Sequence, residues 1–126
     1  MTPEERRVME ALLVAERERV LATEAGLMLE LTSIVEASDQ ANLDDEHDPE
    51  GATVGYERAR VASLLKEARD HLSGIDRAAD RLLAGQYGNC TGCGQAIGAD
   101  RLAAHPSAAT CIACASASSR PSLRRR

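Results

Sequence analysis

Residues 90–114 open with Cys90-Thr91-Gly92-Cys93-Gly94 and close with Cys111-Ile112-Ala113-Cys114. Two residues separate the cysteines within each pair, and seventeen residues separate the two pairs. This spacing is typical of four-cysteine zinc sites, in which each short turn directs two sulfurs at one ion. Gly92 and Gly94 have access to backbone conformations that other residues avoid, and they bring N–H groups toward the thiolates. The stretch therefore predicts one structural Zn²⁺ bound by Cys90, Cys93, Cys111 and Cys114, with no ligand position left for catalysis.

Three other uses of the four cysteines stay open at this point. Two redox Cys-x-x-Cys pairs would need the strand–helix context of a thioredoxin-like fold, which the surrounding sequence lacks. Structural disulfides are disfavoured in a cytoplasmic protein. Iron accepts the same tetrahedral set of sulfurs, and the colour of the metal would separate it from zinc. His105 lies between the two pairs, and we expect it at the surface or beside the ligands because four thiolates complete the shell.

Two long helices are predicted before the cysteines. Thr2-Pro3-Glu4-Glu5 is a helix start, in which Thr2 caps, Pro3 fits the first turn and Glu5 closes a capping box. This first helix extends to about Leu43. Its apolar residues recur every seven positions, which is the spacing of a coiled-coil seam: Leu13, Val20, Leu27 and Ile34.

The second helix is predicted from about Ala52 to Ala84, with Gly85 ending it. From Val61 onward its apolar positions alternate in steps of four and three: Leu65, Ala68, Leu72, Ile75, Ala79 and Leu82. Pro49-Glu50-Gly51 separates two segments of nearly equal length, each roughly 50 Å long as a helix. We therefore expect an antiparallel hairpin rather than a dimeric coiled coil, followed by a turn-rich region and a short last helix at 115–119.

Charge is divided unevenly along the chain. Residues 1–86 hold 10 basic and 19 acidic side chains, whereas residues 87–126 hold 5 basic and 1 acidic. Seven of the acids, with no Lys or Arg among them, crowd the junction of the two helices: Glu36, Asp39, Asp44, Asp45, Glu46, Asp48 and Glu50. Because DNA-binding proteins usually present a broad basic face, duplex DNA is not the expected main partner. A solvated tip is the simplest interpretation of the acids.

Composition also limits the class of protein. The 126 residues suit one domain, and the absence of Trp and Phe favours a thin helical architecture over a thick core. No apolar run is long enough to span a membrane, and the first residues do not resemble a secretory signal, so we expect a cytoplasmic protein. No nucleophile elbow, phosphate loop or metal-binding His pair occurs in the sequence, so we do not expect an enzyme.

The cysteine region resembles the zinc-finger signature of the DksA/TraR family. The resemblance covers about residues 87–114 and includes Tyr87-Gly88, Cys90, Cys93-Gly94, Ile97-Gly98, Arg101-Leu102, Ala104, Pro106, Ala108, Cys111-Ile112 and Cys114. The predicted hairpin extends the likeness to nearly the whole chain. The resemblance implies a bacterial transcription regulator that binds RNA polymerase rather than promoter DNA. It also implies that the acidic coiled-coil tip enters the secondary channel toward the active site.

The resemblance assigns the tip residues in two alternative ways. Well-known family members carry Asp-x-x-Asp-x-Ala at the tip, and this chain offers Asp45-Glu46-His47-Asp48-Pro49-Glu50, with Glu where Ala is expected. Alternatively, Asp48-Pro49-Glu50-Gly51-Ala52-Thr53 is a shortened version of that turn, with Glu50 in place of the second Asp. Asp48 is the leading candidate in both, followed by Asp45, Glu50 and Ala52.

The expected organisation has three parts: a coiled-coil hairpin at 1–86 with its acidic tip at about 38–52, a four-cysteine zinc domain with a short C-terminal helix at 87–119, and a basic tail at 120–126. The leading function is regulation of RNA polymerase without sequence-specific DNA binding and without a membrane. The alternative is a zinc-stapled helical module that binds another protein. A weaker third hypothesis is nucleic-acid binding through the basic C-terminal end, which salt-sensitive retention on DNA would support.

Overall fold

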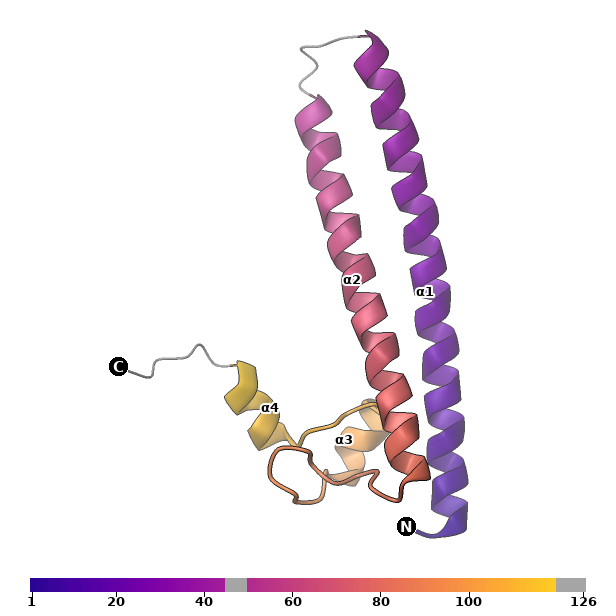
Figure 1. Cartoon of the computed structure of the whole chain (residues 1–126), viewed down its shortest axis with the longest axis vertical. Helices are drawn as coiled ribbons and strands as arrows, with labels where there is room; N and C mark the ends of the chain where they lie inside the picture. Colours follow the sequence, from indigo (N-terminus) through magenta and orange to yellow (C-terminus); the bar gives the residue numbers. More distant parts are fainter. Residues whose placement is uncertain (45–49, 120–126) are drawn as a thin grey trace, which may run out of the picture. The chain divides into compact units, whose positions relative to one another are not determined.

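A computed structural model describes the backbone at residues 1–44 and 50–119, and the side chains outside residues 40–51 and 119–126. Within these residues four helices follow one another: α1 (Pro3–Asp44), α2 (Glu50–Leu83), α3 (Ala99–Ala104) and α4 (Ile112–Ser119). The described part contains no strand, and an isolated antiparallel bridge joins Asn89 and Ala96. The fold is therefore mainly helical, as predicted, with α1 and α2 as the arms of a helical hairpin (Figure 1).

Local capping explains where α1 begins and where α2 ends. The Thr2 amide donates to the Glu5 carboxylate at 2.7 Å, and the Glu5 amide donates to the Thr2 hydroxyl at 3.1 Å, which confirms the predicted capping box. The Thr2 amide also lowers the pKa of the Glu5 carboxyl. After α2, Gly85 has a φ of 75°, and the Gln86 amide donates to the Arg81 carbonyl at 2.8 Å. This left-handed glycine closes the helix.

Two compact units divide the chain, and each is described by itself: Arg17–Leu72, and Met1–Glu16 with Ser73–Arg126. In Arg17–Leu72 the buried side chains form the predicted apolar seam, with Val20 on α1 and Val61, Leu65 and Ala68 on α2. Two ion pairs join the helices, Glu24–Arg69 at 3.0 Å and Glu30–Arg60 at 3.2 Å. The later acid pairs with the earlier arginine, so the two helices are antiparallel here.

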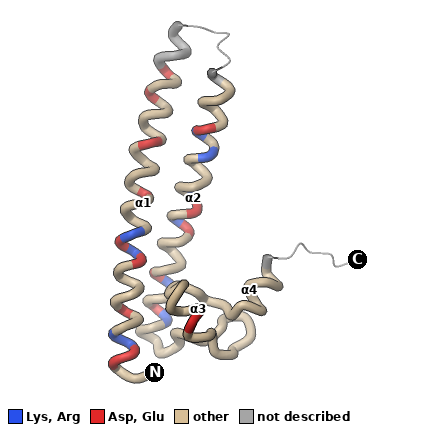
Figure 2. The backbone as a smooth tube through the Cα atoms, turned by 180° about the vertical axis from the view of Figure 1, so that it is seen from behind, with Lys and Arg blue, Asp and Glu red and all other residues tan. Residues whose placement is uncertain are grey.

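These ion pairs are partly exposed, and exposed pairs contribute at most about 1 kcal/mol each. Burial of the apolar seam is therefore the main source of stability in this unit. Figure 2 shows acidic and basic residues distributed along both α1 and α2. No helix among the described residues combines the length and apolar character needed to cross a bilayer.

The second unit packs the ends of the two long helices with the cysteine region. Its buried apolar side chains include Leu13 from α1, Ile75, Ala78 and Leu82 from α2, and Tyr87, Ile97 and Leu102 from the segment that follows. Ile75 is only 1% exposed. Glu16 is also buried, although the heptad pattern gave no reason to expect a carboxylate among the core residues.

The seam departs from the predicted one at a single step on α2. Ala78, not Ala79, is fully buried, and Ala79 is half-buried, as are Leu27 and Leu72. A strict alternation of four and three assumes 3.5 residues per turn. An undistorted helix has 3.6, so the inward-facing position drifts along its length.

Short helices were predicted less well than long ones. Helix α3 was not predicted, because six residues carry no periodic signal, and the last helix begins at Ile112 rather than Ala115. Helix α2 begins at Glu50 rather than about Ala52 and ends one residue before Ala84. In α3 the buried side chain is Leu102, whose Cδ1 lies near the backbone of Gly88, so packing on the chain beneath it stabilises the helix.

Candidate metal centre

The first cysteine pair lies in a tight turn closed by backbone hydrogen bonds. The Ile97 amide donates to the Gly88 carbonyl at 2.7 Å, and the Cys90 amide donates to the Gln95 carbonyl at 2.8 Å. Inside this frame the Gly94 amide donates to the Cys90 carbonyl at 2.9 Å. Gly94 has a φ of 78°, a conformation that favours glycine. The turn returns the chain over Cys90 and places Cys93 beside it.

The second cysteine pair lies at the start of α4. Cys111 immediately precedes the helix, and its carbonyl accepts from the Ala115 amide at 2.9 Å. Cys114 follows three residues later in the first turn, so both sulfurs lie on one side of the helix. A helix N-terminus also stabilises nearby negative charge. The pair is therefore placed for thiolate ligands, and α4 begins earlier than predicted because the cysteines are part of its first turn.

The structure brings the four predicted ligand residues together. The sulfurs of Cys90, Cys93, Cys111 and Cys114 all lie within 4.8 Å of one another, and all four are free thiols. The Cys93 and Cys111 sulfurs are 3.8 Å apart. Zn–S bonds of about 2.3 Å in a tetrahedron require sulfurs about 3.8 Å apart, so the cluster fits zinc. His105 is exposed and is not part of the cluster.

Hydrogen bonds prepare Cys90 as a thiolate. The amides of Cys111 and Gly92 each lie 3.3 Å from the Cys90 sulfur. Cys90 as a whole residue is only 3% exposed. The Cys111 amide, followed by the amide of Cys93, lowers the pKa of Cys90 to about 6 despite burial. Hydrogen bonding to Cys90 and then to Cys111 and Cys93 raises the pKa of Cys114 to about 12.

This difference between the thiols is what a crowded sulfur cluster produces. One thiolate is stabilised by amides, while a further negative charge beside it is disfavoured. A divalent cation at the centre removes that penalty and makes all four thiolates favourable. The donor set therefore fits one structural Zn²⁺ with a complete shell, and it leaves no position for a reacting water.

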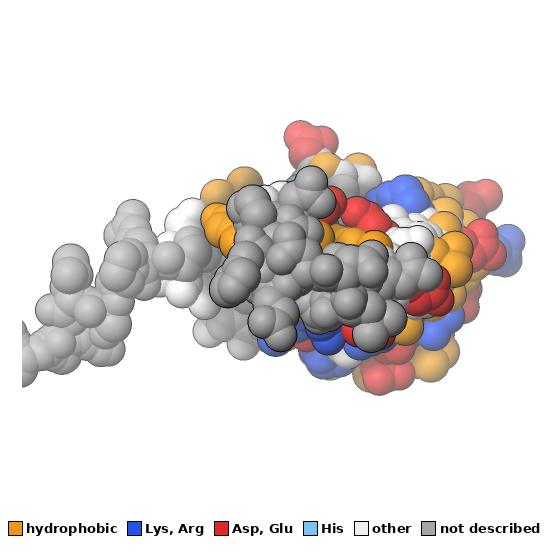
Figure 3. Space-filling model, turned by 90° about the horizontal axis from the view of Figure 1, so that it is seen from above, with side chains coloured by type: hydrophobic (Ala, Val, Ile, Leu, Met, Phe, Trp, Pro, Cys, Tyr) orange, Lys and Arg blue, Asp and Glu red, His pale blue; other side chains and the backbone are white. Residues whose placement is uncertain are grey.

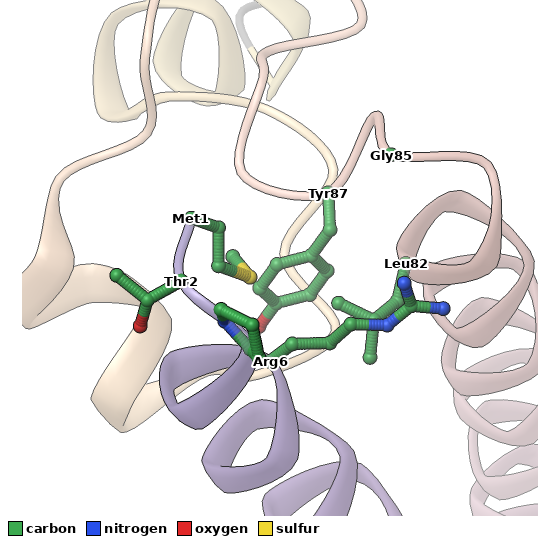
Figure 4. A pocket seen from close by; sticks show the side chains of 7 residues that line it. Met1, Thr2, Arg6, Leu82, Gly85 and Tyr87 are labelled. Atoms are coloured by element: carbon green, nitrogen blue, oxygen red, sulfur yellow. The ribbon is translucent and has the colours of Figure 1, made fainter.

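Tyr87 connects the metal region with α1 inside the same unit. Its hydroxyl lies 2.8 Å from the Pro106 carbonyl, to which it donates, and 3.2 Å from the Met9 sulfur. The ring is buried and lines a pocket of about 280 Å³ with Met1, Thr2, Pro3, Arg6, Leu82 and Gly85 (Figure 4). Sequence reasoning quoted Tyr87 within the cysteine signature but assigned it no role. The residue type could have indicated a role, because the hydroxyl of a buried tyrosine needs a hydrogen-bond partner.

The described residues include only part of the predicted tip. Asp45 and Asp48 lie outside the described residues. Glu50 begins α2, its side chain lies outside the description, and Ala52 is exposed in the first turn of that helix. The tip assignment thus stays a prediction.

Fold and site together define a helical-hairpin protein with a four-cysteine zinc finger. Residues 85–120 match the model of the prokaryotic dksA/traR C4-type zinc finger. The structure resembles that of transcription factor DksA2 from Pseudomonas aeruginosa, with a TM-score of 0.73 and 26% sequence identity. The similarity covers 92% of this chain and 84% of that one. At the level of sequence, no curated protein matches the chain.

Residues 85–120 carry the zinc-finger signature of the DksA/TraR family, and the structural similarity to DksA2, which includes the hairpin, supports the same family. The same two findings support a DksA-type regulator. The zinc-finger match and the four converging cysteine sulfurs support one structural Zn²⁺. The resemblance found in the cysteine signature is therefore confirmed, as is the mainly helical fold.

Proposed function

We propose that this protein is a cytoplasmic, non-catalytic transcription regulator that binds RNA polymerase and inserts its acidic hairpin tip into the secondary channel. The observation that carries the proposal is the likeness to a transcription factor over 92% of the chain, hairpin included. The match at residues 85–120 supports the same class of regulator independently.

The charge distribution favours a protein partner over DNA. Figure 3 shows acidic, basic and hydrophobic side chains interspersed over the visible face, whereas a DNA-binding face is predominantly basic. Between residues 87 and 119 the sequence contains only one Arg and no Lys. Direct sequence-specific DNA binding is therefore not part of the proposal.

The acidic residues are concentrated in the sequence where the first long helix ends and the second begins. Helix α1 ends at Asp44 and α2 begins at Glu50, and Asp45 and Asp48 fall between these two positions in the sequence. Carboxylates brought close to a polymerase active site would act on its basic side chains or its catalytic magnesium ion through charge. We therefore propose that the flanks of the hairpin and the zinc end provide most of the affinity, and that the tip acids provide the effect.

The first experiment measures binding to purified RNA polymerase by the tagged, zinc-loaded protein. Retention of the polymerase is expected. Absence of binding would refute the proposal and leave the zinc-stapled interaction module as the better hypothesis. Retention on promoter DNA alone, lost as salt is raised, would instead favour the nucleic-acid hypothesis.

The second experiment compares Asp48→Asn with Asp80→Asn, which removes the same charge near the opposite end of α2. Asp48→Asn keeps the shape of the side chain, so we expect unchanged polymerase binding and a reduced effect in transcription reactions on several promoters. The Asp80→Asn control is expected to match the wild type in both measurements. An Asp48→Asn protein with the full wild-type effect would make this residue a solvated surface charge.

A further inference from the structure

The five residues before the second cysteine pair, Pro106–Thr110, are held at three carbonyls. The Pro106 carbonyl accepts from the Tyr87 hydroxyl at 2.8 Å, and the Ala109 carbonyl accepts from the Thr91 amide at 2.8 Å. The Thr110 carbonyl accepts from Nε of Arg101 at 2.9 Å. This segment carries no helix or strand of its own, so these bonds fix its path.

Of the three bonds, the one from Arg101 is nearest to the ligands in sequence. Thr110 and Cys111 share a peptide unit: the carbonyl of Thr110 accepts from Arg101, and the amide of Cys111 donates to the Cys90 sulfur at 3.3 Å. A peptide unit is planar, so fixing its oxygen also fixes the direction of its N–H. Arg101 thus acts on two ligands, by orienting the amide toward Cys90 and by placing the Cα that carries the Cys111 thiol.

Helix α3 places the Arg101 side chain within hydrogen-bonding distance of the Thr110 carbonyl. Its start is Gly98, with no side-chain cap, and its end is held by the His105 amide, which donates to the Arg101 carbonyl at 2.7 Å. Leu102 is buried, while Arg101 is half-buried and turned to the Thr110 carbonyl. The backbone of Arg101 therefore holds the end of α3, and its side chain holds the segment that leads into the second cysteine pair.

We infer that Arg101 is a positioning residue for the metal site, acting through its Nε–H on the Thr110 carbonyl rather than through its charge. Groups that orient metal ligands from outside the shell typically change metal affinity by about 10–100-fold when they are removed. The inference concerns the metal site alone and does not depend on the proposed interaction with RNA polymerase.

Two substitutions separate the hydrogen bond from the charge. Gln has an amide nitrogen at the same position along the side chain as Nε of Arg, so Arg101→Gln keeps a donor and removes the charge. Met has a methyl group at that position, so Arg101→Met removes both donor and charge at similar length. Asp100→Asn is the matched control, because it changes the charge of the neighbouring exposed residue on α3.

The measurements are zinc affinity by competition with a chromophoric chelator and the absorption spectrum of the cobalt-substituted protein. Arg101→Met is expected to weaken zinc binding by about 10–100-fold. It is also expected to alter the cobalt–thiolate bands, because the thiolates are less well aligned. Arg101→Gln and the Asp100→Asn control are expected to stay close to the wild type.

Two results would overturn the inference. Wild-type zinc affinity and an unchanged cobalt spectrum in Arg101→Met would show that the bond does not position the ligands. Equal weakening in Arg101→Gln and Arg101→Met would assign the effect to the guanidinium charge. Far-UV circular dichroism follows α1 and α2 in the same samples, and if Arg101→Met loses this helical signal, Arg101→Gln alone decides the question.

Discussion

The Tyr87 hydroxyl donates to the Pro106 carbonyl across nineteen residues at 2.8 Å, and it does so from a buried ring. The bond joins the residue just after α2 to the segment that leads to the second cysteine pair. It therefore links the end of the hairpin to the metal region inside one compact unit. A tyrosine that serves this link must stay protonated, which makes the stability of the unit depend on pH in a defined direction.

Stability is expected to fall in alkaline solution through Tyr87. Burial raises the pKa of Tyr87 above its ordinary value near 10, although the nearby Arg81 opposes the shift. The folded protein thus holds this proton more tightly than the unfolded chain. The contribution is complete below the unfolded pKa and is lost as pH rises from about 10 through the folded pKa.

The measurement removes the signal of the only other tyrosine, Tyr56. In a Tyr56→Phe background the absorbance of tyrosinate reports Tyr87 alone, and it should appear at higher pH in the folded protein than after denaturation. Urea unfolding across the same pH range should show a steeper loss of stability in wild type than in Tyr87→Phe. Identical titration of Tyr87 in folded and denatured protein would disprove this explanation.

Removal of zinc is expected to unfold the cysteine region and leave the hairpin largely helical. Metal binding supplies folding free energy on the order of 10 kcal/mol in small zinc modules. Hydrogen exchange with and without a chelator should show loss of protection at residues 87–114. Helices α1 and α2 should retain most of theirs, because an apolar seam stabilises them. Elemental analysis should give one zinc per chain, and less than half an equivalent, or a red iron chromophore, would contradict the assignment.

Replacement of Gly92 by Ala is expected to weaken the metal site. A Cβ at Gly92 would lie 3.1 Å from the Cys114 sulfur and 3.4 Å from the Cys114 Cβ, so the second cysteine pair would have to move. Overpacking of this kind costs about 1–3 kcal/mol. Gly98→Ala is the control, because a Cβ there meets nothing within 4 Å and its φ of −60° suits any residue. Equal zinc affinity in the two variants, by chelator competition, would remove the steric role of Gly92.

The stability lost when a seam residue is replaced by Ala is expected to increase with the burial of that residue. Ile75→Ala should lower the free energy of unfolding by about 2–5 kcal/mol, because Ile75 is only 1% exposed. Leu72→Ala should cost less than Ile75→Ala, because Leu72 is half-buried. Val14→Ala, at a residue 56% exposed, should change stability by less than about 0.5 kcal/mol. Urea denaturation of zinc-loaded protein measures all three, and a Val14→Ala effect as large as that of Ile75→Ala would contradict this account of the seam.

The sequence by itself determined the features that depend on local chemistry or long periodicity. The Thr2–Glu5 capping box is local, the heptad pattern repeats over many turns, and the cysteine spacing specifies its own short turns. These signals gave the two long helices to within two residues and named the four cysteines that the fold brings together.

Tertiary structure decided what depends on partners distant in sequence. Six residues are too few for a periodic signal, so α3 forms through the packing of Leu102 near Gly88. The choice of Ala78 over Ala79 in the core follows from accumulated helix rotation and from what lies opposite. The bonds from Tyr87 to Pro106 and from Arg101 to Thr110 exist only after the chain has folded back on itself. Every residue has a backbone carbonyl, so a hydrogen bond to one does not require a particular side chain on the accepting residue. No sequence pattern could therefore predict these bonds.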